Sequence, residues 1–304
     1  MQPTSSDSSQ HSIDNSQLGA LTGCFRSQEE FEHFRREKGG LALTRWLIDE
    51  NLRSLGFKGS FAGWSELIGS PTYYFFNIQS DTQPADLREQ LVCATTGLSA
   101  RARFSLTLAG RLLGNPDEAE LYVTEQATLG YRWIKARYPR AVGSEYFDEE
   151  SRPNLQAALG MLSIPDETLC FQDVTQLSHP DRSFDAILSF DVLEHVPDYQ
   201  AALSEFYRVL KPGGYLILTA PFEQSESTGT LRARLESDGS ITHLEEPEYH
   251  GDPVREGGVL CFHNFGWDLL DSVREKGFQD ALMALPWDYT QGMVGPLWTL
   301  VARR

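Results

Sequence analysis

Acidic side chains follow several short apolar runs of this chain, at points where a strand would give way to a loop. Glu125 comes after the run at 121–123, and Glu145 lies 20 residues further on, near the end of a second run at 141–146. A carboxylate accepts two hydrogen bonds at once, and this separation suits the acid that accepts both ribose hydroxyls in dinucleotide and adenosine sites. Glu145 is therefore a candidate cofactor contact, with a solvated surface acid as the alternative.

Three histidines could move a proton near neutral pH. His195 follows the apolar run at 184–190, whereas His243 and His250 lie in a polar insertion at 223–262. An imidazole titrates near neutrality and suits a general base, so all three are candidate catalytic residues. A structural, hydrogen-bonding role is the alternative for each of them.

Two further polar residues of the insertion, Tyr249 and Asp252, are the candidate substrate contacts, because loops after sheet strands are where doubly wound folds bind ligands. The alternative for this segment is a metal site built from His243, His250 and Asp252. Their spacing matches no known set of metal ligands, so the sequence predicts no metal.

The segment at 184–222 predicts one strand–helix–strand unit that would position these groups. The apolar run at 184–190 reads as a strand buried on both faces, and Asp198 supplies a helix cap before apolar positions at helical spacing. Lys211-Pro212-Gly213-Gly214 ends that helix, and 215–219 reads as the next buried strand. Such a unit should be parallel and right-handed.

Two phrases in this unit carry a family resemblance: Asp-Val-Leu-Glu-His-Val at 191–196 and Leu-Lys-Pro-Gly-Gly at 210–214. With them, the segment resembles the class I S-adenosylmethionine-dependent methyltransferases of the type 11 kind. The resemblance implies S-adenosylmethionine as cofactor and a methyl transfer as the reaction. It also implies that Asp191, at the end of the fourth strand, lies beside the methionine end of the cofactor and its reactive methyl group.

The resemblance implies further cofactor contacts nearer the N-terminus. Thr124 and Glu125 open the first loop, where Glu125 would take the acidic role of the first motif. Asp173 and Val174 match the phrase whose acid bonds the adenine amine, although a plain turn acid is the alternative. The first loop retains only one glycine, Gly130, where the family usually has several.

The predicted fold is α/β: a doubly wound, mostly parallel, seven-stranded Rossmann-like sheet with an antiparallel C-terminal hairpin and a mixed N-terminal cap region. A third strand is expected at 168–172, and the final hairpin at 278–285 and 297–302. The methyltransferase domain would span 115–304 and include the substrate-loop insertion at 223–262. Trp287 and Tyr289 should pack or line the acceptor pocket.

The N-terminal part of the chain divides into two predicted segments. Residues 1–20 are rich in Ser, Gln and Asp and should be disordered, because they can bury little apolar surface. Residues 21–114 should form a cap that resembles a zinc ribbon whose cysteine pairs are broken. Cys24 and Cys93 lack their partners, so a remnant without metal is predicted; an accidental spacing is the alternative.

Composition limits the partners. A formal net charge of −17 over 304 residues opposes binding to nucleic acid and favours a small-molecule acceptor. No apolar run is long enough to span a bilayer, and the N-terminus lacks a signal-peptide pattern, so a cytoplasmic protein is predicted. Its four scattered cysteines indicate thiols, and the oligomeric state stays open.

The sequence hypothesis is thus methyl transfer from S-adenosylmethionine to an oxygen or nitrogen of a small molecule. A non-catalytic relative that keeps the fold as a binding or partner module is the alternative, motivated by the glycine-poor first loop and the broken cysteine pairs. A nicotinamide-dependent oxidoreductase is disfavoured because that loop lacks the glycines that a pyrophosphate requires.

Overall fold

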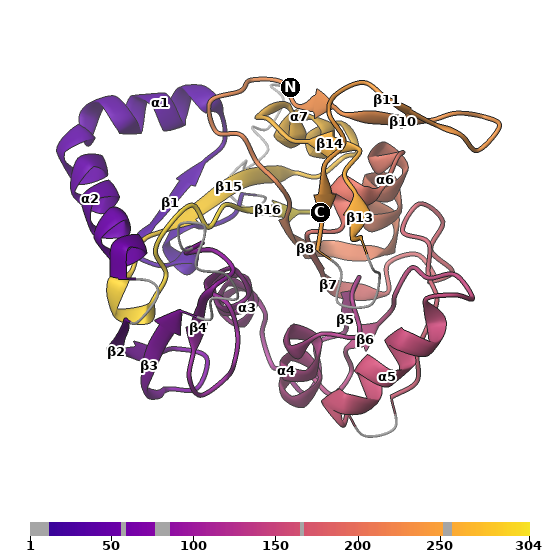
Figure 1. Ribbon diagram of the computed structural model, residues 1–304, viewed down its shortest axis with the longest axis horizontal. Coiled ribbons are helices and arrows are strands. Elements are labelled where there is room, and N and C mark those ends of the chain that lie inside the picture. Colours follow the sequence, from indigo (N-terminus) through magenta and orange to yellow (C-terminus); the bar gives the residue numbers. More distant parts are fainter. Residues whose placement is uncertain (1–11, 56–58, 77–85, 165–166, 252–256) are drawn as a thin grey trace, which may run out of the picture.

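A computed structural model provides the structure of the chain (Figure 1). It describes residues 12–55, 59–76, 86–164, 167–251 and 257–304. The central element is a seven-stranded sheet in the order β1-β15-β16-β8-β7-β5-β6. Its strands are β1 (Thr22–Phe25), β5 (Leu121–Val123), β6 (Val142–Gly143), β7 (Phe184–Phe190), β8 (Leu210–Thr219), β15 (Asp280–Pro286) and β16 (Thr299–Arg303).

The sheet has a parallel half and an antiparallel half. Strands β6, β5, β7 and β8 pair in parallel, and β16, β15 and β1 continue the sheet by antiparallel pairing. The predicted seven-stranded sheet with a C-terminal antiparallel hairpin is confirmed. One strand differs from the expectation: residues 168–172 contribute only a bridge between Phe171 and Glu145, and the N-terminal β1 completes the seven.

Helices cover both faces of the sheet, which explains why its strands are apolar along their whole length. In β5, Leu121 and Val123 point into one hydrophobic core, and Tyr122 between them points into the other. Helices α3 (Ala100–Leu112) and α4 (Leu129–Arg137) pack in the first core, and α6 (Tyr199–Val209) and α7 (Asp268–Glu275) pack in the second. Helix α5 (Arg152–Leu162) lies beyond β6 (Figure 1).

The predicted strand–helix–strand unit is present, but its second strand, β8, begins at Leu210 and includes residues 211–214, which the sequence assigned to a turn before a strand at 215–219. Strand β7 leads through a short 3-10 turn, η3 (Leu193–His195), into α6 and then β8. The Asp198 carboxylate accepts a hydrogen bond from the Ala201 amide, so it caps α6 as its sequence position suggests. Gly213, at φ +82°, supplies a left-handed residue within the first part of β8, where the pairing with β7 is irregular.

The N-terminal region is more closely joined to the sheet than the sequence indicated. Part of the segment predicted to be disordered is folded: Ile13 and Leu18 are buried, and residues 15–18 form the 3-10 turn η2 (Asn15–Leu18). Residues 1–11 lie outside the described residues. Helices α1 (Gln28–Glu37) and α2 (Gly39–Leu55) follow β1, with the break between them at Lys38, directly before Gly39.

A separate antiparallel sheet of β2 (Ser60–Ser65), β3 (Ser70–Phe76) and β4 (Leu91–Cys93) lies beside α3. Cys93 ends β4, whereas Cys24 lies in β1 of the main sheet, so the two predicted remnants of a zinc ribbon belong to different sheets. Both are free thiols. The zinc-ribbon resemblance of this region therefore stays a prediction.

The insertion at 223–262 forms short hairpins instead of one irregular loop. Its strands are β9 (Thr230–Leu231), β10 (Ala233–Leu235), β11 (Ile241–His243), β12 (Tyr249–His250) and β13 (Val259–Leu260). Strand β9 pairs with β14 (His263–Asn264), which follows the insertion, and the β10–β11 hairpin projects from the body of the molecule (Figure 1).

The C-terminal segment between β15 and β16 packs against the N-terminal region. Tyr289 opens the turn η4 (Tyr289–Gln291) and stacks on Phe61 of β2, with ring centroids 4.6 Å apart. The guanidinium of Arg45 in α2 lies 5.4 Å from the centroid of the Trp287 ring. Trp287 and Tyr289 therefore pack against the N-terminal region, which is one of the two roles that the sequence predicts for them. None of the described helices is long and apolar enough to cross a membrane.

Candidate active site

Three carboxylates follow three adjacent parallel strands. Glu125 comes after β5, Glu145 after β6 and Asp191 directly after β7, and β5 lies between the other two strands in the sheet. Because the carboxyl ends of parallel strands meet at one edge, these side chains gather there. The negative charges of Glu145 and Asp191 both help to raise the pKa of Glu125, as expected for groups that lie near one another.

Glu145 holds the first loop. Its Oε1 accepts hydrogen bonds of 2.7 Å from the backbone amides of Gln126 and Ala127. The Gln126 side chain in turn donates to the Thr168 carbonyl and accepts from the Cys170 amide. A loop with one glycine is therefore fixed by side-chain contacts, and Glu145 is oriented toward the segment where the sequence predicted a cofactor.

The other predicted cofactor residues differ in their surroundings. Thr124 is buried, and its hydroxyl donates to the Ser189 hydroxyl of β7 at 3.1 Å. Asp173 Oδ1 accepts from the amide and the hydroxyl of Thr175, which is the plain turn that the sequence offered as the alternative. Val174 is buried in the second hydrophobic core. The adenine role of Asp173 and Val174 stays a prediction.

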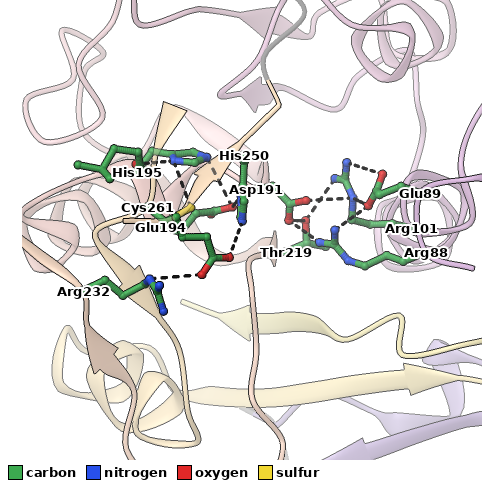
Figure 2. Close-up of polar contacts among 12 residues, drawn as sticks. Arg88, Glu89, Arg101, Asp191, Glu194, His195, Thr219, Arg232, His250 and Cys261 are labelled. Atoms are coloured by element: carbon green, nitrogen blue, oxygen red, sulfur yellow. Dashed lines mark hydrogen bonds and ion pairs between the residues drawn. The ribbon is translucent and has the colours of Figure 1, made fainter. Parts of the chain in front are cut away.

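Two arginines of the N-terminal region contact Asp191 (Figure 2). Asp191 Oδ1 accepts from Arg88 at 2.5 Å and from the Thr219 hydroxyl at 2.9 Å, and Oδ2 lies 3.3 Å from Arg101 Nε. Glu89 pairs with both arginines. Asp191 also has φ +54°, an unusual conformation for a residue other than glycine, and such strain often occurs at functional sites.

These charges set the ionisation of the acids at this edge. Burial alone would raise the pKa of Asp191, but Arg101 and Arg88 outweigh it and lower that pKa to about 2. Burial raises the pKa of Glu125 to about 8, with Arg101 acting against it. At neutral pH the site therefore contains an ionised Asp191 and a mostly protonated Glu125.

On the other side of Asp191, the structure brings together His195 and His250 (Figure 2). Their ring centroids lie 5.2 Å apart, and both lie near Glu194 and Cys261. A side-chain contact with Cys261, followed by one with Glu194, raises the pKa of His250 to about 10. A protonated His250 cannot accept a proton at neutral pH, which leaves His195 as the better placed of the pair.

The remaining predicted substrate-side residues are not gathered with this pair. His243 is exposed and pairs with Ala233 in the projecting β10–β11 hairpin. Tyr249 precedes His250 in β12, and its side chain is 55% exposed. Asp252 lies outside the described residues.

Residues 142–218 match the family model described as a methyltransferase domain. They include Glu145, Asp173 and Asp191. Over these residues the chain is therefore similar to a methyltransferase domain. The resemblance inferred from the two sequence phrases is thereby confirmed, and with it the methyl donor that the family uses.

Curated relatives of this methyltransferase domain act in different chemical settings. A probable S-adenosylmethionine-dependent methyltransferase of Mycolicibacterium smegmatis is 30% identical over 49% of this chain and 59% of its own length. A sterol 24-C-methyltransferase of Aspergillus fumigatus is 30% identical over 38% of this chain and 30% of its own length. A 27-O-demethylrifamycin SV methyltransferase of Amycolatopsis mediterranei is 30% identical over 29% of this chain and 34% of its own length.

The matched parts thus span less than two thirds of these relatives. Among solved structures, an S-adenosylmethionine-dependent methyltransferase from Mesorhizobium loti is similar with a TM-score of 0.45 and 16% identity, over 67% of this chain and 98% of that one.

Sequence reasoning missed four charged residues and one thiol at this edge: Arg88, Glu89, Arg101, Glu194 and Cys261. Arg88 and Arg101 lie within the region 21–114 that was predicted to resemble a zinc ribbon, and no local pattern there indicates their contact with Asp191. Glu194 was part of the recognised phrase, where its neighbours His195 and Asp191 were assigned roles. Cys261 ends the insertion and was interpreted only as a free thiol.

Proposed function

We propose that this chain transfers a methyl group from S-adenosylmethionine to an oxygen or nitrogen of a small-molecule acceptor. The observation that carries this proposal is the placement of Glu125, Glu145 and Asp191 after three adjacent parallel strands, within a domain of the methyltransferase family. Carboxylates at one edge suit a ligand that carries hydroxyl groups and positive charge.

The residues at this edge of the sheet fit S-adenosylmethionine. Glu145 would accept the ribose hydroxyls, Asp173 with Val174 would border the adenine, and Thr124, Glu125 and Asp191 would face the methionine end. When bound, the cofactor supplies an electrophilic methyl group on a positively charged sulfur. The chain's part is to hold the acceptor in line with that group and, where the acceptor is protonated, to remove its proton.

On the acceptor side, His195 is the proposed base. It lies four positions after Asp191, and its Nδ1 is hydrogen-bonded to the Leu260 carbonyl at 2.9 Å, which fixes the ring. His250 and Tyr249 would contact the acceptor from β12, and His243 and Asp252 remain proposals from the sequence. The charge of −17 supports a small-molecule acceptor instead of a nucleic acid.

A second candidate function is a non-catalytic module, and one observation favours it. Arg88 and Arg101 already satisfy Asp191, the residue that the family places beside the reactive methyl group. An arginine pair in this position would compete with a positively charged cofactor.

Titration with S-adenosylhomocysteine distinguishes the two functions. We expect saturable heat of binding in the micromolar range, with one molecule bound per chain. Incubation with methyl-labelled cofactor and a mixture of candidate metabolites, followed by mass spectrometry, then identifies the acceptor. Absence of binding at millimolar ligand would reject the methyltransferase proposal and favour the module.

A further inference from the structure

Four side chains that are distant in the sequence form a compact cluster beside Asp191: Glu194, His195, His250 and Cys261, called here the His–Cys cluster (Figure 2). Glu194 and His195 belong to η3, His250 to β12, and Cys261 follows β13. One ligand atom from each of His195, His250 and Cys261 lies within 4.8 Å of the others. The cluster therefore joins the insertion hairpin to the turn after β7.

Glu194 is the unusual member. It is 0% exposed, and neither carboxylate oxygen makes a hydrogen bond within the described part of the chain. The nearby groups are two imidazole nitrogens: His250 Nδ1 lies 3.3 Å from Oε1, and His195 Nε2 lies 3.8 Å from it. A buried carboxylate is costly unless it is paired or coordinates a metal, so this arrangement calls for a cation.

Each of the two histidines has one ring nitrogen in contact with an oxygen atom outside the cluster. His195 Nδ1 contacts the Leu260 carbonyl at 2.9 Å, and His250 Nε2 contacts Glu248 Oε1 at 3.3 Å. In each ring the other nitrogen is the one that faces Glu194, and the Cys261 Sγ lies 4.0 Å from His195 Nδ1. A ring nitrogen held by a carbonyl or a carboxylate, with the second nitrogen directed into the site, is the usual arrangement of metal-binding histidines.

We propose that His195, His250 and Cys261, whose ligand atoms lie within 4.8 Å of one another, bind a divalent transition-metal ion of the zinc type, and that Glu194, close to both imidazoles, supplies the fourth ligand. Tetrahedral zinc with bonds of about 2.0–2.3 Å separates its ligand atoms by roughly 3.3–3.8 Å. The distances from Glu194 Oε1 to His250 Nδ1 and His195 Nε2 are 3.3 and 3.8 Å. Thiolate and imidazole ligands select zinc, cobalt or copper over magnesium and calcium, which prefer oxygen.

The ion would act as a structural tie. Four protein ligands complete a tetrahedral site and leave no position for substrate, as in structural zinc sites. The ion would fix the β12–β13 hairpin against η3, which begins two residues after Asp191, and would hold that side of the site in place. This inference stands on the cluster alone and does not depend on the methyltransferase activity. A bound ion would occupy His195 and His250 and so exclude the base and acceptor roles proposed for them above.

Cobalt(II) is the probe that tests the site. The full chain is stripped with a chelator, dialysed and titrated with cobalt chloride, and the thiolate-to-cobalt charge-transfer absorption in the near ultraviolet is followed. We expect one equivalent to bind, with tetrahedral bands in the visible region, and an equivalent of zinc to displace it. Cys261→Ser should abolish the charge-transfer band, whereas the matched control Cys24→Ser should keep it.

A second variant covers the case in which Cys261→Ser does not fold. His250→Gln retains the thiolate and should weaken zinc binding by tenfold or more in a competition titration, whereas the exposed His243→Gln should bind as the unmodified chain does. Zinc should also raise the Tm of the unmodified chain but not that of His250→Gln. Absence of stoichiometric binding by the unmodified chain, a thiolate band that survives Cys261→Ser, or an unchanged affinity in His250→Gln would overturn the proposal. The cluster would then be an internal network of imidazole, thiolate and carboxylate.

Discussion

Arg88 and Asp191, 103 positions apart in the sequence, form a 2.5 Å ion pair that links the N-terminal region to the end of β7. Arg101 adds a second guanidinium on the same carboxylate. The N-terminal region is therefore part of the predicted cofactor edge and does more than cover it. Any ligand that reaches Asp191 must share it with these two arginines or displace them.

The stability of the chain should depend on this pairing. Arg101→Met removes the Nε contacts with Asp191 and Glu89 from a side chain that is 17% exposed. We expect the free energy of unfolding in urea to fall by about 1.5–3 kcal/mol, the range for hydrogen bonds to charged groups. Arg152→Met, which breaks the exposed pair with Glu149, is the matched control and should change it by less than about 0.5 kcal/mol.

A double-mutant cycle with Asp191→Asn would isolate the coupling between the two residues. If the effects of Arg101→Met and Asp191→Asn simply add, the ion pair does not contribute to stability, and the arginine acts through Glu89 or through packing.

Asp191 should make the protein sensitive to acid. Its folded-state pKa of about 2 lies below the ordinary value of 3.8, because Arg101 and Arg88 outweigh the effect of burial. The other carboxyl groups near these arginines are those of Glu89 and Glu125. A lowered pKa gives stability that is present above pH 3.8 and is lost as the pH falls toward 2. The loss should be about 2 kcal/mol. Unfolding curves from pH 5 to 2 check this: the gap between the unmodified chain and Asp191→Asn should narrow across that window, and a constant gap would contradict it.

The contribution of Glu125 to stability should have the opposite pH dependence. Burial raises its folded-state pKa to about 8. Among the charged groups nearby, Arg101 lowers this pKa, whereas Glu145, Asp191 and Glu89 raise it. Between pH 4.5 and 8 the unfolded chain is ionised at this position while the folded chain retains the proton. Stability is therefore full below pH 4.5 and declines as the pH rises toward 8. Glu125→Gln removes this dependence, so its stability relative to the unmodified chain should increase from pH 5 to 8 in thermal unfolding. A relative stability that does not change with pH would mean that Glu125 is ionised in the folded state.

Local patterns were sufficient for the elements that are continuous in sequence. The bounds of β7 and the cap of α6 followed from an apolar run and from Asp198, because both depend on neighbours within a few residues. The segment 168–172 looked like a strand but makes only one bridge, at Phe171. Strand β1 was missed for the converse reason: its four residues are a strand only because β15 offers an open edge to pair with.

The site was predictable only in part. Glu125, Glu145 and Asp191 could be placed together because each follows a parallel strand, and strand order fixes which edge they share. The partners of Asp191 could not be placed, since Arg88 and Arg101 reach it through tertiary packing. The same holds for the His–Cys cluster: His195 and Cys261 are 66 positions apart, and no spacing rule joins them.

Glu145 offers the most direct test of the cofactor edge, because it has two separable tasks. It holds the first loop through Oε1 and, in the proposed function, accepts the ribose hydroxyls. Glu145→Ala removes both, and we expect the affinity for S-adenosylhomocysteine to fall by about 1–3 kcal/mol, the range for a lost partner that leaves polar groups unpaired. Glu145→Gln keeps one acceptor oxygen for the loop amides, so its Tm should stay closer to that of the unmodified chain while its affinity still falls. Calorimetric titration of both variants, with Glu149→Ala as an exposed control, measures the two effects. An unchanged affinity in Glu145→Ala would remove this residue from the ribose contact and leave it only its role in holding the loop.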